Sequence, residues 1–235
     1  MLKRLGLNRV AYDWRAQHVN EFEEEILEYK KHGMEFFAFW SVHEEAFRLF
    51  KKHKIHPQIW QTLPNPKADV REAQVAATAK AMLPLVERTK KLGCKLGLYN
   101  HGGWGGEPAN LVAVCKYLRE HHKAMHVGIV YNLHHGHGHI ADFKKSLKLM
   151  QPYLHCLNLN GMNKGAKPKI LAVGKGKHEA AMIATIHKSG YTGPIGILDH
   201  RNDTDTEVAL RENLAGLRGI LEQLGAKKTL ESYSK

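Results

Sequence analysis

The sequence predicts an α/β protein built as a parallel β/α barrel, and three observations carry this prediction. The chain has 235 residues, which suits a single β/α barrel domain spanning 1–235. Short apolar strands alternate with amphipathic helical segments, as in a parallel sheet with helical crossovers. A cationic helix end followed by a short strand also recurs along the chain as an internal repeat.

The strands are expected where near-continuous apolar runs occur, because strands of a parallel sheet are buried on both faces. Their expected ranges are 8–12, 35–40, 58–60, 95–99, 127–133, 156–159 and 194–198. Several of these runs follow a basic helix end and a glycine, as in 30–33, 90–93 and 187–190. Cations complement the negative end of a helix, and glycine permits the left-handed residue that ends it.

Helices are expected in the amphipathic segments between these strands. Their ranges are 21–31, 42–53, 70–92, 108–122, 140–150, 178–188 and 204–224. Pro84 lies inside the longest segment and predicts a kink or a split there. No glycine-rich phosphate fingerprint follows the first strand, which disfavours a doubly wound dinucleotide-binding sheet.

The first residues indicate that the barrel begins upstream of this sequence. Residues 1–6 have the pattern of a last helical turn, so one strand and most of one helix are expected to precede Met1. Restoring that first βα unit gives the eight units of a closed TIM barrel. The alternative is that residues 2–5 are the frayed start of a natural seven-strand barrel.

Charge and cysteine content narrow the class of protein. The formal net charge is +12, which fits either an anionic partner such as nucleic acid or lysines on solvated helix faces. The lysines near expected helix ends favour the second interpretation, and no nucleic-acid partner is expected. Three cysteines without CxxC spacing disfavour a disulfide framework or a cysteine zinc site.

The sequence contains no membrane span and no signal peptide at Met1. A cytoplasmic location is therefore expected for the chain as it stands, and export if an upstream signal peptide precedes it. A barrel lacking one βα unit would expose two sheet edges, so a homo-oligomer is also considered.

Polar residues follow nearly every expected strand, where the βα loops of a barrel meet and where its chemistry takes place. This regularity predicts an enzyme or a ligand-binding protein. The catalytic candidates are His101, His135, Asp199 and His200, and the substrate-binding candidates are Trp14, Trp40, Tyr99, Asn100, Trp104, Asn132, His134, Asn158, Asn160 and Lys175.

Tryptophans among these candidates point to a carbohydrate, because aromatic faces stack on the apolar C–H faces of sugar rings. Trp14, Trp40 and Trp104 are all expected at the strand ends, with Trp60 nearby. The alternative is that these rings only close the top of the barrel. Amides and imidazoles beside them would bind sugar hydroxyls.

Two further segments suggest ligand chemistry without specifying it. Residues 134–139 read HHGHGH, which fits a Zn, Mn or Fe site and equally fits acid–base or hydrogen-bonding histidines. Residues 174–177 read GKGK before a helix. Their amides, with Lys175, could hold a phosphate or carboxylate, or they could form an ordinary turn.

Four motifs resemble those of the xylose-isomerase-like barrel superfamily, a group of sugar phosphate isomerases and epimerases. They are residues 98–103 (LYNHGG), 130–135 (VYNLHH), 157–161 (LNLNG) and 190–197 (GYTGPIGI). The resemblance covers essentially the whole chain except the first βα unit. A similar subgroup is linked to carbohydrate catabolism and is often exported.

The resemblance implies one divalent metal, but this sequence departs from the family at each ligand position. Tyr99, Asn132, Asn158 and Leu198 stand where Glu, Asp, His and Glu are common. Without carboxylates, a divalent cation loses the negative charge that holds it. Either another set, His101, His135, Asp199 and His200, binds Mn, Zn or Mg, or the site works without metal.

The leading hypothesis is a sugar isomerase, epimerase or lyase that transfers a proton next to a carbonyl of a small-molecule carbohydrate. His101 and His135 would be the base and the acid, and Asp199 or His200 a second proton donor or acceptor. Asn132, Asn158 and Asn160 would orient hydroxyls. The alternatives are a non-catalytic sugar-binding barrel and a nucleic-acid enzyme of the apurinic-endonuclease type.

Overall fold

Strands and helices alternate through the described chain, as the periodicity predicts. The computed structural model describes residues 1–13 and 16–232, and its strands follow the hydrogen-bonded order β1-β2-β3-β4-β5-β6-β7. Strand pairs β1–β2, β2–β3, β3–β4 and β6–β7 are parallel. Internal contacts divide the chain into an N-terminal unit, Asn8–Ile129, and a C-terminal unit, Met1–Leu7 with Val130–Lys235.

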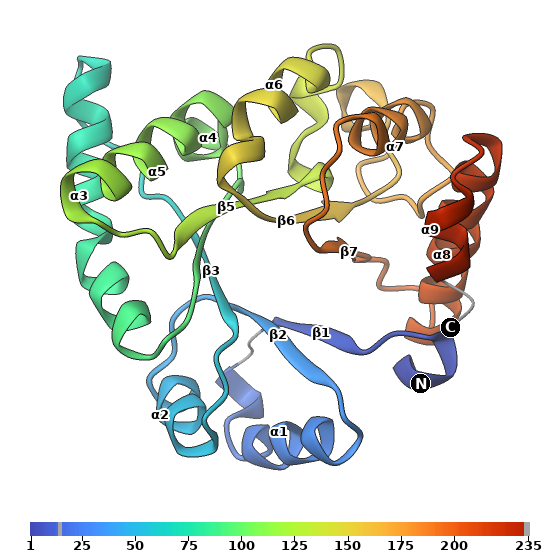
Figure 1. Ribbon diagram of the computed structural model, residues 1–235, viewed down its shortest axis with the longest axis horizontal. Coiled ribbons are helices and arrows are strands. Elements are labelled where there is room, and N and C mark those ends of the chain that lie inside the picture. Colours follow the sequence, from blue (N-terminus) through green and yellow to red (C-terminus); the bar gives the residue numbers. More distant parts are fainter. Residues whose placement is uncertain (14–15, 233–235) are drawn as a thin grey trace. The chain divides into compact units, whose positions relative to one another are not determined.

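The N-terminal unit contains the first four βα repeats of the sequence (Figure 1). Its elements are β1 (Arg9–Asp13), η2 (Ala16–His18), α1 (Phe22–Lys31), β2 (Glu35–Trp40), α2 (Glu44–His53), β3 (Gln58–Thr62), α3 (Arg71–Lys91), β4 (Leu96–Tyr99), α4 (Gly103–Gly106) and α5 (Pro108–His122). The strands and helices that the sequence predicts in this unit are confirmed, with ends that differ by at most two residues. Helix α4 was not expected.

An aromatic cluster holds α1 and α2 on strands β1 and β2. The Phe50 ring of α2 lies 5.7 Å from Phe36 and 5.1 Å from Phe39, and Phe22 of α1 lies 5.9 Å from Phe36. Phe36 and Phe39 of β2 both contact Phe50, although strict alternation would put residues three apart on opposite faces of the sheet. The pairing of β1 with β2 explains this exception. Val10 pairs with Phe36 and Ala11 with Ala38, so β2 contains one extra residue, as in a β-bulge.

The repeated helix endings have the backbone that the sequence predicts. Gly33 and Gly93 follow α1 and α3 with φ of 59° and 68°, in the left-handed region that glycine adopts without strain. Helix α2 lacks a glycine, and Lys54 takes the same conformation with φ of 52°. Paired lysines occupy the last turns of α1, α2 and α3, where they complement the helix dipole.

Pro84 does not split α3, so that part of the prediction is wrong. The helix runs from Arg71 to Lys91 with Pro84 inside it. The proline ring is exposed, whereas Met82, Leu85 and Val86 beside it are buried. Burial of these neighbours outweighs the one backbone hydrogen bond that proline removes.

The C-terminal unit contains the last repeats, together with the first residues of the chain. Its elements are η1 (Leu2–Leu5), the second half of β5 (Val127–Asn132), η3 (Leu133–His135), η4 (His137–His139), α6 (Phe143–Met150), η5 (Gln151–Tyr153), β6 (Leu154–Leu159), η6 (Lys164–Ala166), α7 (Glu179–Lys188), β7 (Ile195–Ile197), α8 (Thr206–Gln223) and α9 (Lys227–Ser232). Helix α6 begins three residues later than predicted, because residues 140–142 form a turn between η4 and the helix.

The first residues end as a helix ends, which confirms the pattern seen at 1–6. Gly6 closes η1 with φ of 72°, and the Leu7 amide donates to the Leu2 carbonyl. Arg4 forms an ion pair of 2.8 Å with Glu207 of α8. Figure 1 shows this turn beside α8, and the ion pair is part of what attaches it to the C-terminal unit.

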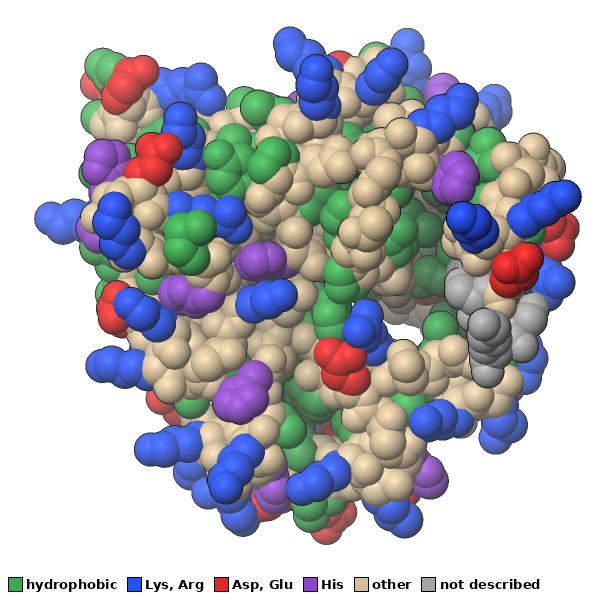
Figure 2. Space-filling model, in the orientation of Figure 1, with side chains coloured by type: hydrophobic (Ala, Val, Ile, Leu, Met, Phe, Trp, Pro, Cys, Tyr) green, Lys and Arg blue, Asp and Glu red, His purple; other side chains and the backbone are tan. Residues whose placement is uncertain are grey.

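Lysine and arginine side chains are spread over the face drawn in Figure 2 and lie among acidic side chains. Many acids form ion pairs along one helix, as Glu207 does with Arg211 and Glu222 with Arg218. In the described part of the chain, no helix has the length and apolar character needed to cross a membrane.

Helix α8 approaches the segment after β6 so closely that one of its residues must be glycine. A Cβ atom on Gly216 would lie 1.8 Å from the carbonyl oxygen of Val173. A Cβ atom on Gly219, one turn further along α8, would meet nothing within 4 Å. The contact therefore fixes the position of α8 against residues 173 and 174.

This pair of glycines gives a matched test of the fold. We expect Gly216→Ala to destabilise the protein by about 1–3 kcal/mol or more, because the added methyl forces the helix away from Val173. Gly219→Ala should instead stabilise it by up to about 1 kcal/mol, because alanine favours the helix. Chemical denaturation of both variants measures the difference, and equal effects would contradict the close approach.

Candidate functional site

In the N-terminal unit, the aromatic residues at the strand ends form a packed cluster. The Trp40 ring lies 4.8 Å from Trp60 and 4.6 Å from Tyr99, both nearly perpendicular to it. Trp60 and Tyr99 are each 1% exposed, and the Trp60 indole donates to Gln58. Packing therefore accounts for two of these rings, while Trp40 is half-buried.

The segment after β4 presents residues of differing accessibility. Asn100 is buried, whereas His101 is exposed with its ring 6.2 Å from that of Tyr99. Trp104 lies on α4, and its indole donates to Gln74 of α3 at 2.8 Å. The last candidate of this unit, Trp14, lies outside the described residues.

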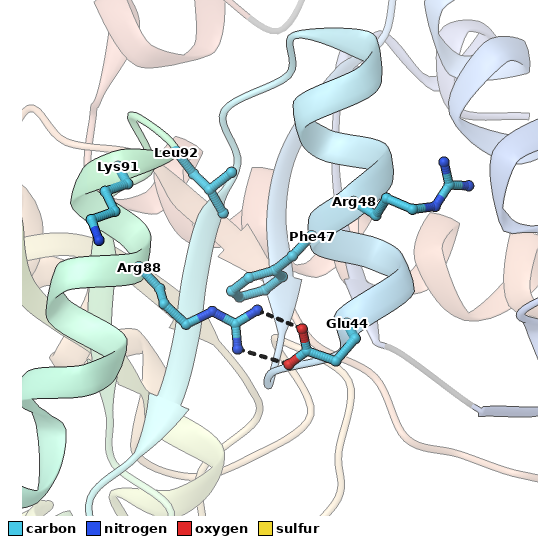
Figure 3. Close-up of a pocket in the computed structure, with 6 residues that line it drawn as sticks. All are labelled: Glu44, Phe47, Arg48, Arg88, Lys91 and Leu92. Atoms are coloured by element: carbon cyan, nitrogen blue, oxygen red, sulfur yellow. Dashed lines mark hydrogen bonds and ion pairs between the residues drawn. The ribbon is translucent and has the colours of Figure 1, made fainter.

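A surface depression of about 310 Å³ lies between α2 and α3 of the same unit. Figure 3 shows the guanidinium group of Arg88 beside the ring of Phe47, with its two terminal nitrogens directed at Glu44. The two hydrogen bonds measure 2.8 and 2.9 Å, and the guanidinium carbon lies 4.6 Å from the Phe47 ring centre. Arg88 is thus paired within the protein, and its role is to join the two helices.

In the C-terminal unit, three imidazoles lie together. The His134 ring centre is 4.7 Å from His135 and 5.2 Å from His200. His134 is buried, His135 half-buried and His200 exposed. The side chain of Asn132 accepts a hydrogen bond of 2.9 Å from the His134 amide. Asn132 thereby caps η3 and sets where the two consecutive histidines begin.

Strand β6 and the residue that follows it contribute two buried amides beside this cluster, since η3 contacts β6. Asn158 and Asn160 are 4% and 1% exposed. Among the described residues, Asn158 Nδ2 and Asn160 Oδ1 have no hydrogen-bond partner. A buried polar atom without a partner costs about 1–3 kcal/mol. One donor and one acceptor are thus left for a ligand at the end of β6.

Asp199, at the end of β7, is held by a dense set of donors. Arg201 contacts both carboxylate oxygens, at 2.8 to 3.1 Å, and its backbone amide donates to Oδ1. Asn213 of α8 donates to Oδ2 at 2.7 Å. Burial raises the pKa of Asp199, but these hydrogen bonds outweigh it and leave the pKa below its ordinary value.

The glycine-rich turn at 174–177 binds a carboxylate of the protein itself. Gly174 and Gly176 donate their amides to Glu179 Oε1, at 3.0 and 2.6 Å, and Met162 donates to Oε2 at 2.9 Å. Of the two alternatives for this turn, these contacts favour the ordinary turn, because the buried Glu179 already accepts from the amides of Gly174 and Gly176. Lys175 lies exposed on this turn.

His137 joins two loops of the C-terminal unit. Its Nδ1 lies 2.8 Å from the Asn163 carbonyl oxygen and its Nε2 lies 3.3 Å from that of Lys169. Asn160 contacts the same loop, donating to the carbonyls of Gly161 and Lys169. The histidine-rich segment thus divides into a ring cluster at 134–135 and a structural contact at His137.

The cysteines lie in the core. All three are buried, and within the described residues none forms a disulfide. Burial raises the pKa of Cys94 to about 12 and that of Cys115 to about 11. Thiols with such values remain protonated near neutral pH and are poor nucleophiles.

Sequence reasoning missed three residues that organise the C-terminal unit: Glu179, Arg201 and Asn213. Asn213 carried a signal, because it is a polar residue on the apolar stripe formed by Ala209, Leu217 and Ile220. An acidic residue in the first turn of a helix is also a known partner for backbone amides. Nothing in the local sequence indicated that Arg201 would bind Asp199.

Comparisons with known proteins show the fold. No family model and no curated protein matches the sequence. Among solved structures, the chain is similar to the IolI protein with a binding zinc atom, at 11% identity and a TM-score of 0.73, covering 94% of this chain and 90% of that one. The chain is also similar to a xylose isomerase domain protein from Planctomyces limnophilus, at 12% identity and a TM-score of 0.71, covering 95% of this chain and 92% of that one.

A third similar structure is 3-keto-D-glucoside 4-epimerase, YcjR, from E. coli. It shares 13% identity at a TM-score of 0.64, covering 92% of this chain and 91% of that one. This chain therefore has the fold of the xylose-isomerase-like TIM barrels. The fold class predicted from the sequence is confirmed.

The Asp199 ion pair predicts how stability depends on pH. A carboxylate with a lowered pKa stabilises the folded state above its ordinary value of about 3.9, and this stabilisation is lost as the pH falls below it. Asp199→Asn should therefore reduce stability near pH 7 by about 1–3 kcal/mol. The difference from the parent should shrink as the pH falls from about 4 toward 3.

Denaturant titrations of both proteins between pH 3 and 7 test this expectation. Asp203→Asn is the matched control, because Asp203 is exposed in the same loop. A difference that stays constant across the whole range would show that the ion pair does not carry the effect.

Proposed function

We propose that this protein is a sugar isomerase or epimerase that transfers a proton at a carbon next to a carbonyl. The observation that carries the proposal is the cluster of His134, His135 and His200 beside the two buried amides of β6. Imidazoles transfer protons near neutral pH, and amides bind hydroxyls. Structures with the same fold include proteins titled L-ribulose 3-epimerase and D-psicose 3-epimerase in the presence of D-fructose.

The proposed step begins when His135 removes the proton from the carbon next to the carbonyl. The C–H electron pair forms the enediolate double bond, and the carbonyl pair moves to oxygen. His200 donates a hydrogen bond to that oxygen or protonates it, which lowers the barrier. Return of a proton to the opposite face gives the epimer, and return to the neighbouring carbon after oxygen-to-oxygen proton transfer gives the isomer.

The amides of β6 would orient the sugar during this step. Asn158 Nδ2 can donate to a substrate oxygen, and Asn160 Oδ1 can accept from a hydroxyl. Binding would then satisfy two buried atoms that otherwise lack partners. A sugar offers both kinds of group on neighbouring carbons, whereas an apolar ligand would leave the two atoms unsatisfied.

Asp199 fits a supporting role better than direct proton transfer. Its two oxygens accept from Arg201 and Asn213, and its lowered pKa keeps it ionised at neutral pH. A carboxylate in that state is a weak base. His101 belongs to the N-terminal unit, and its proposed role as a proton-transfer group is tested separately by substitution.

The residues present do not fit the divalent metal that the fold family implies. Two similar structures, the IolI protein and a xylose isomerase-like TIM barrel protein from Mycobacterium smegmatis, contain zinc and magnesium respectively. In this chain Tyr99, Asn132 and Leu198 stand at positions where the resemblance places carboxylates. The described residues include no group of three His, Cys, Asp or Glu able to hold a metal ion. No step of the proposed reaction therefore uses a metal.

The catalytic test is proton exchange in heavy water. D-Fructose and D-tagatose are incubated with the protein, and NMR follows loss of the proton next to the carbonyl. His135→Ala should lower the exchange rate by about 10²–10⁴-fold, the usual contribution of a positioned acid or base. The matched control is His187→Ala, because His187 is exposed at the end of α7.

A parallel His101→Ala variant tests the candidate of the N-terminal unit. Full activity in both His101→Ala and His135→Ala would rule out the proposed mechanism. Binding of either sugar by calorimetry without proton exchange would indicate a sugar-binding protein instead of an enzyme.

Chelation provides an independent prediction. Dialysis against EDTA should leave the exchange rate within about twofold of the untreated protein, because the donor set lacks the carboxylates that a divalent cation needs. Metal analysis of the dialysed protein provides the check. Loss of activity that returns with added Mn²⁺, Mg²⁺ or Zn²⁺ would contradict this expectation.

A further inference from the structure

Helix α8 contacts both loops that follow the last two strands, and one buried side chain makes the polar contacts. Asn213 is 0% exposed. Its Oδ1 accepts from the Val173 amide at 2.9 Å, and its Nδ2 donates to Asp199 Oδ2 at 2.7 Å and to the Ala209 carbonyl at 2.8 Å. The acceptor and the two amide hydrogens thus each have a partner.

The contact to Val173 fixes the segment after β6. Gly216 lies one turn beyond Asn213 on α8 and leaves room for the Val173 carbonyl. The same segment is held from its other side by Glu179, which accepts from the Gly174 amide. Val173 and Gly174 are therefore held between α8 and the first residue of α7.

The contact to Asp199 fixes the segment after β7. Asp199 is the second residue after β7 and directly precedes His200. Its carboxylate is held by Asn213 from α8 and by Arg201, whose Nη1 also pairs with Glu212 of α8 at 2.6 Å. Residues 199 and 201, on either side of His200, are thus both attached to the same helix.

We infer that Asn213 is a positioning residue that, through Asp199, holds His200 against His134. This inference rests on the proposed function only for the role of His200. The geometry stands independently: the two rings are 5.2 Å apart, and His200 is exposed. An exposed side chain has many rotamers, so a backbone fixed on both sides is what limits where its ring can lie.

Asn213 suits this role because an amide can donate and accept at once. Aspartate at this position would lose both donors and place a second carboxylate against Asp199. Leucine would fill the space but leave the Val173 amide without its partner. A displacement of about 1 Å at a reacting group can lower a rate by roughly 10²-fold, so a positioning residue should affect turnover more than binding.

The structural test measures the nuclear Overhauser effect between ring protons of His134 and His200 in histidine-labelled protein. The parent should show this effect. Asn213→Ala and the near-isosteric Asp199→Asn should each weaken it by about half or more, because both release the segment after β7. Leu217→Ala is the matched control, since Leu217 is also buried on α8 but belongs to its apolar packing.

A double variant provides the rescue. Asn213→Asp combined with Asp199→Asn exchanges the donor and the acceptor, so the contact between the two side chains can form again. In this double variant, the nuclear Overhauser effect between His134 and His200 should be stronger than in Asn213→Asp alone. Undiminished signals in both Asn213→Ala and Asp199→Asn, or an equal loss in Leu217→Ala, would overturn the inference.

The kinetic test uses the same proton exchange from D-fructose and D-tagatose. Asn213→Ala should lower kcat by roughly tenfold or more while KM changes less than about twofold. A weakened ring contact with an unchanged kcat would overturn the catalytic part of the inference. If Asn213→Ala weakens a ring contact that the parent shows, but the parent catalyses no exchange, the positioning by Asn213 is supported and the proposed function fails.

Discussion

The attachment of α8 to the segments after β6 and β7 is the constraint on which the candidate site of the C-terminal unit depends. Asn213 and Gly216 lie one turn apart on this helix. The first supplies hydrogen bonds to Val173 and Asp199, and the second permits backbone contact with Val173. Parallel strands need a helical crossover before each next strand. In this unit α8 also determines where two strand ends place their side chains.

Two carboxylates of this unit, the buried Glu179 and the partly buried Asp199, are bound by donors of the protein. Glu179 accepts from backbone amides, while Asp199 accepts from Arg201 and Asn213. An ionised carboxylate cannot be buried without such partners. The positions at which the motif resemblance implies metal ligands hold Tyr99, Asn132, Asn158 and Leu198. The negative charge of these two carboxylates therefore supports loop structure, and for this reason the proposed proton transfer is assigned to the imidazoles.

The two units use their strand ends differently. In the N-terminal unit, Trp60 and Tyr99 are packed into the core around Trp40. In the C-terminal unit, Asn158 and Asn160 are equally buried but keep polar atoms without partners among the described residues. Burial stabilises the first arrangement by removing apolar area from water, whereas the second carries a polar cost that a ligand could relieve.

The sequence by itself determined the alternation of strands and helices, the basic helix ends and the polar residues at the carboxyl ends of strands. These features are local, because hydrophobic periodicity, helix caps and strand ends depend on neighbours a few residues apart. The continuity of α3 through Pro84 and the filling of the 174–177 turn by Glu179 could not be predicted in this way, because each depends on packing or hydrogen bonding in the folded chain. Only the tertiary structure decided that Asp199 binds Arg201 and Asn213, and that His134 lies beside His200. The contacts of Asn213 with Asp199 and of His134 with His200 join separate segments of the chain, and the contact of Asp199 with Arg201 depends on a loop whose conformation α8 helps to fix.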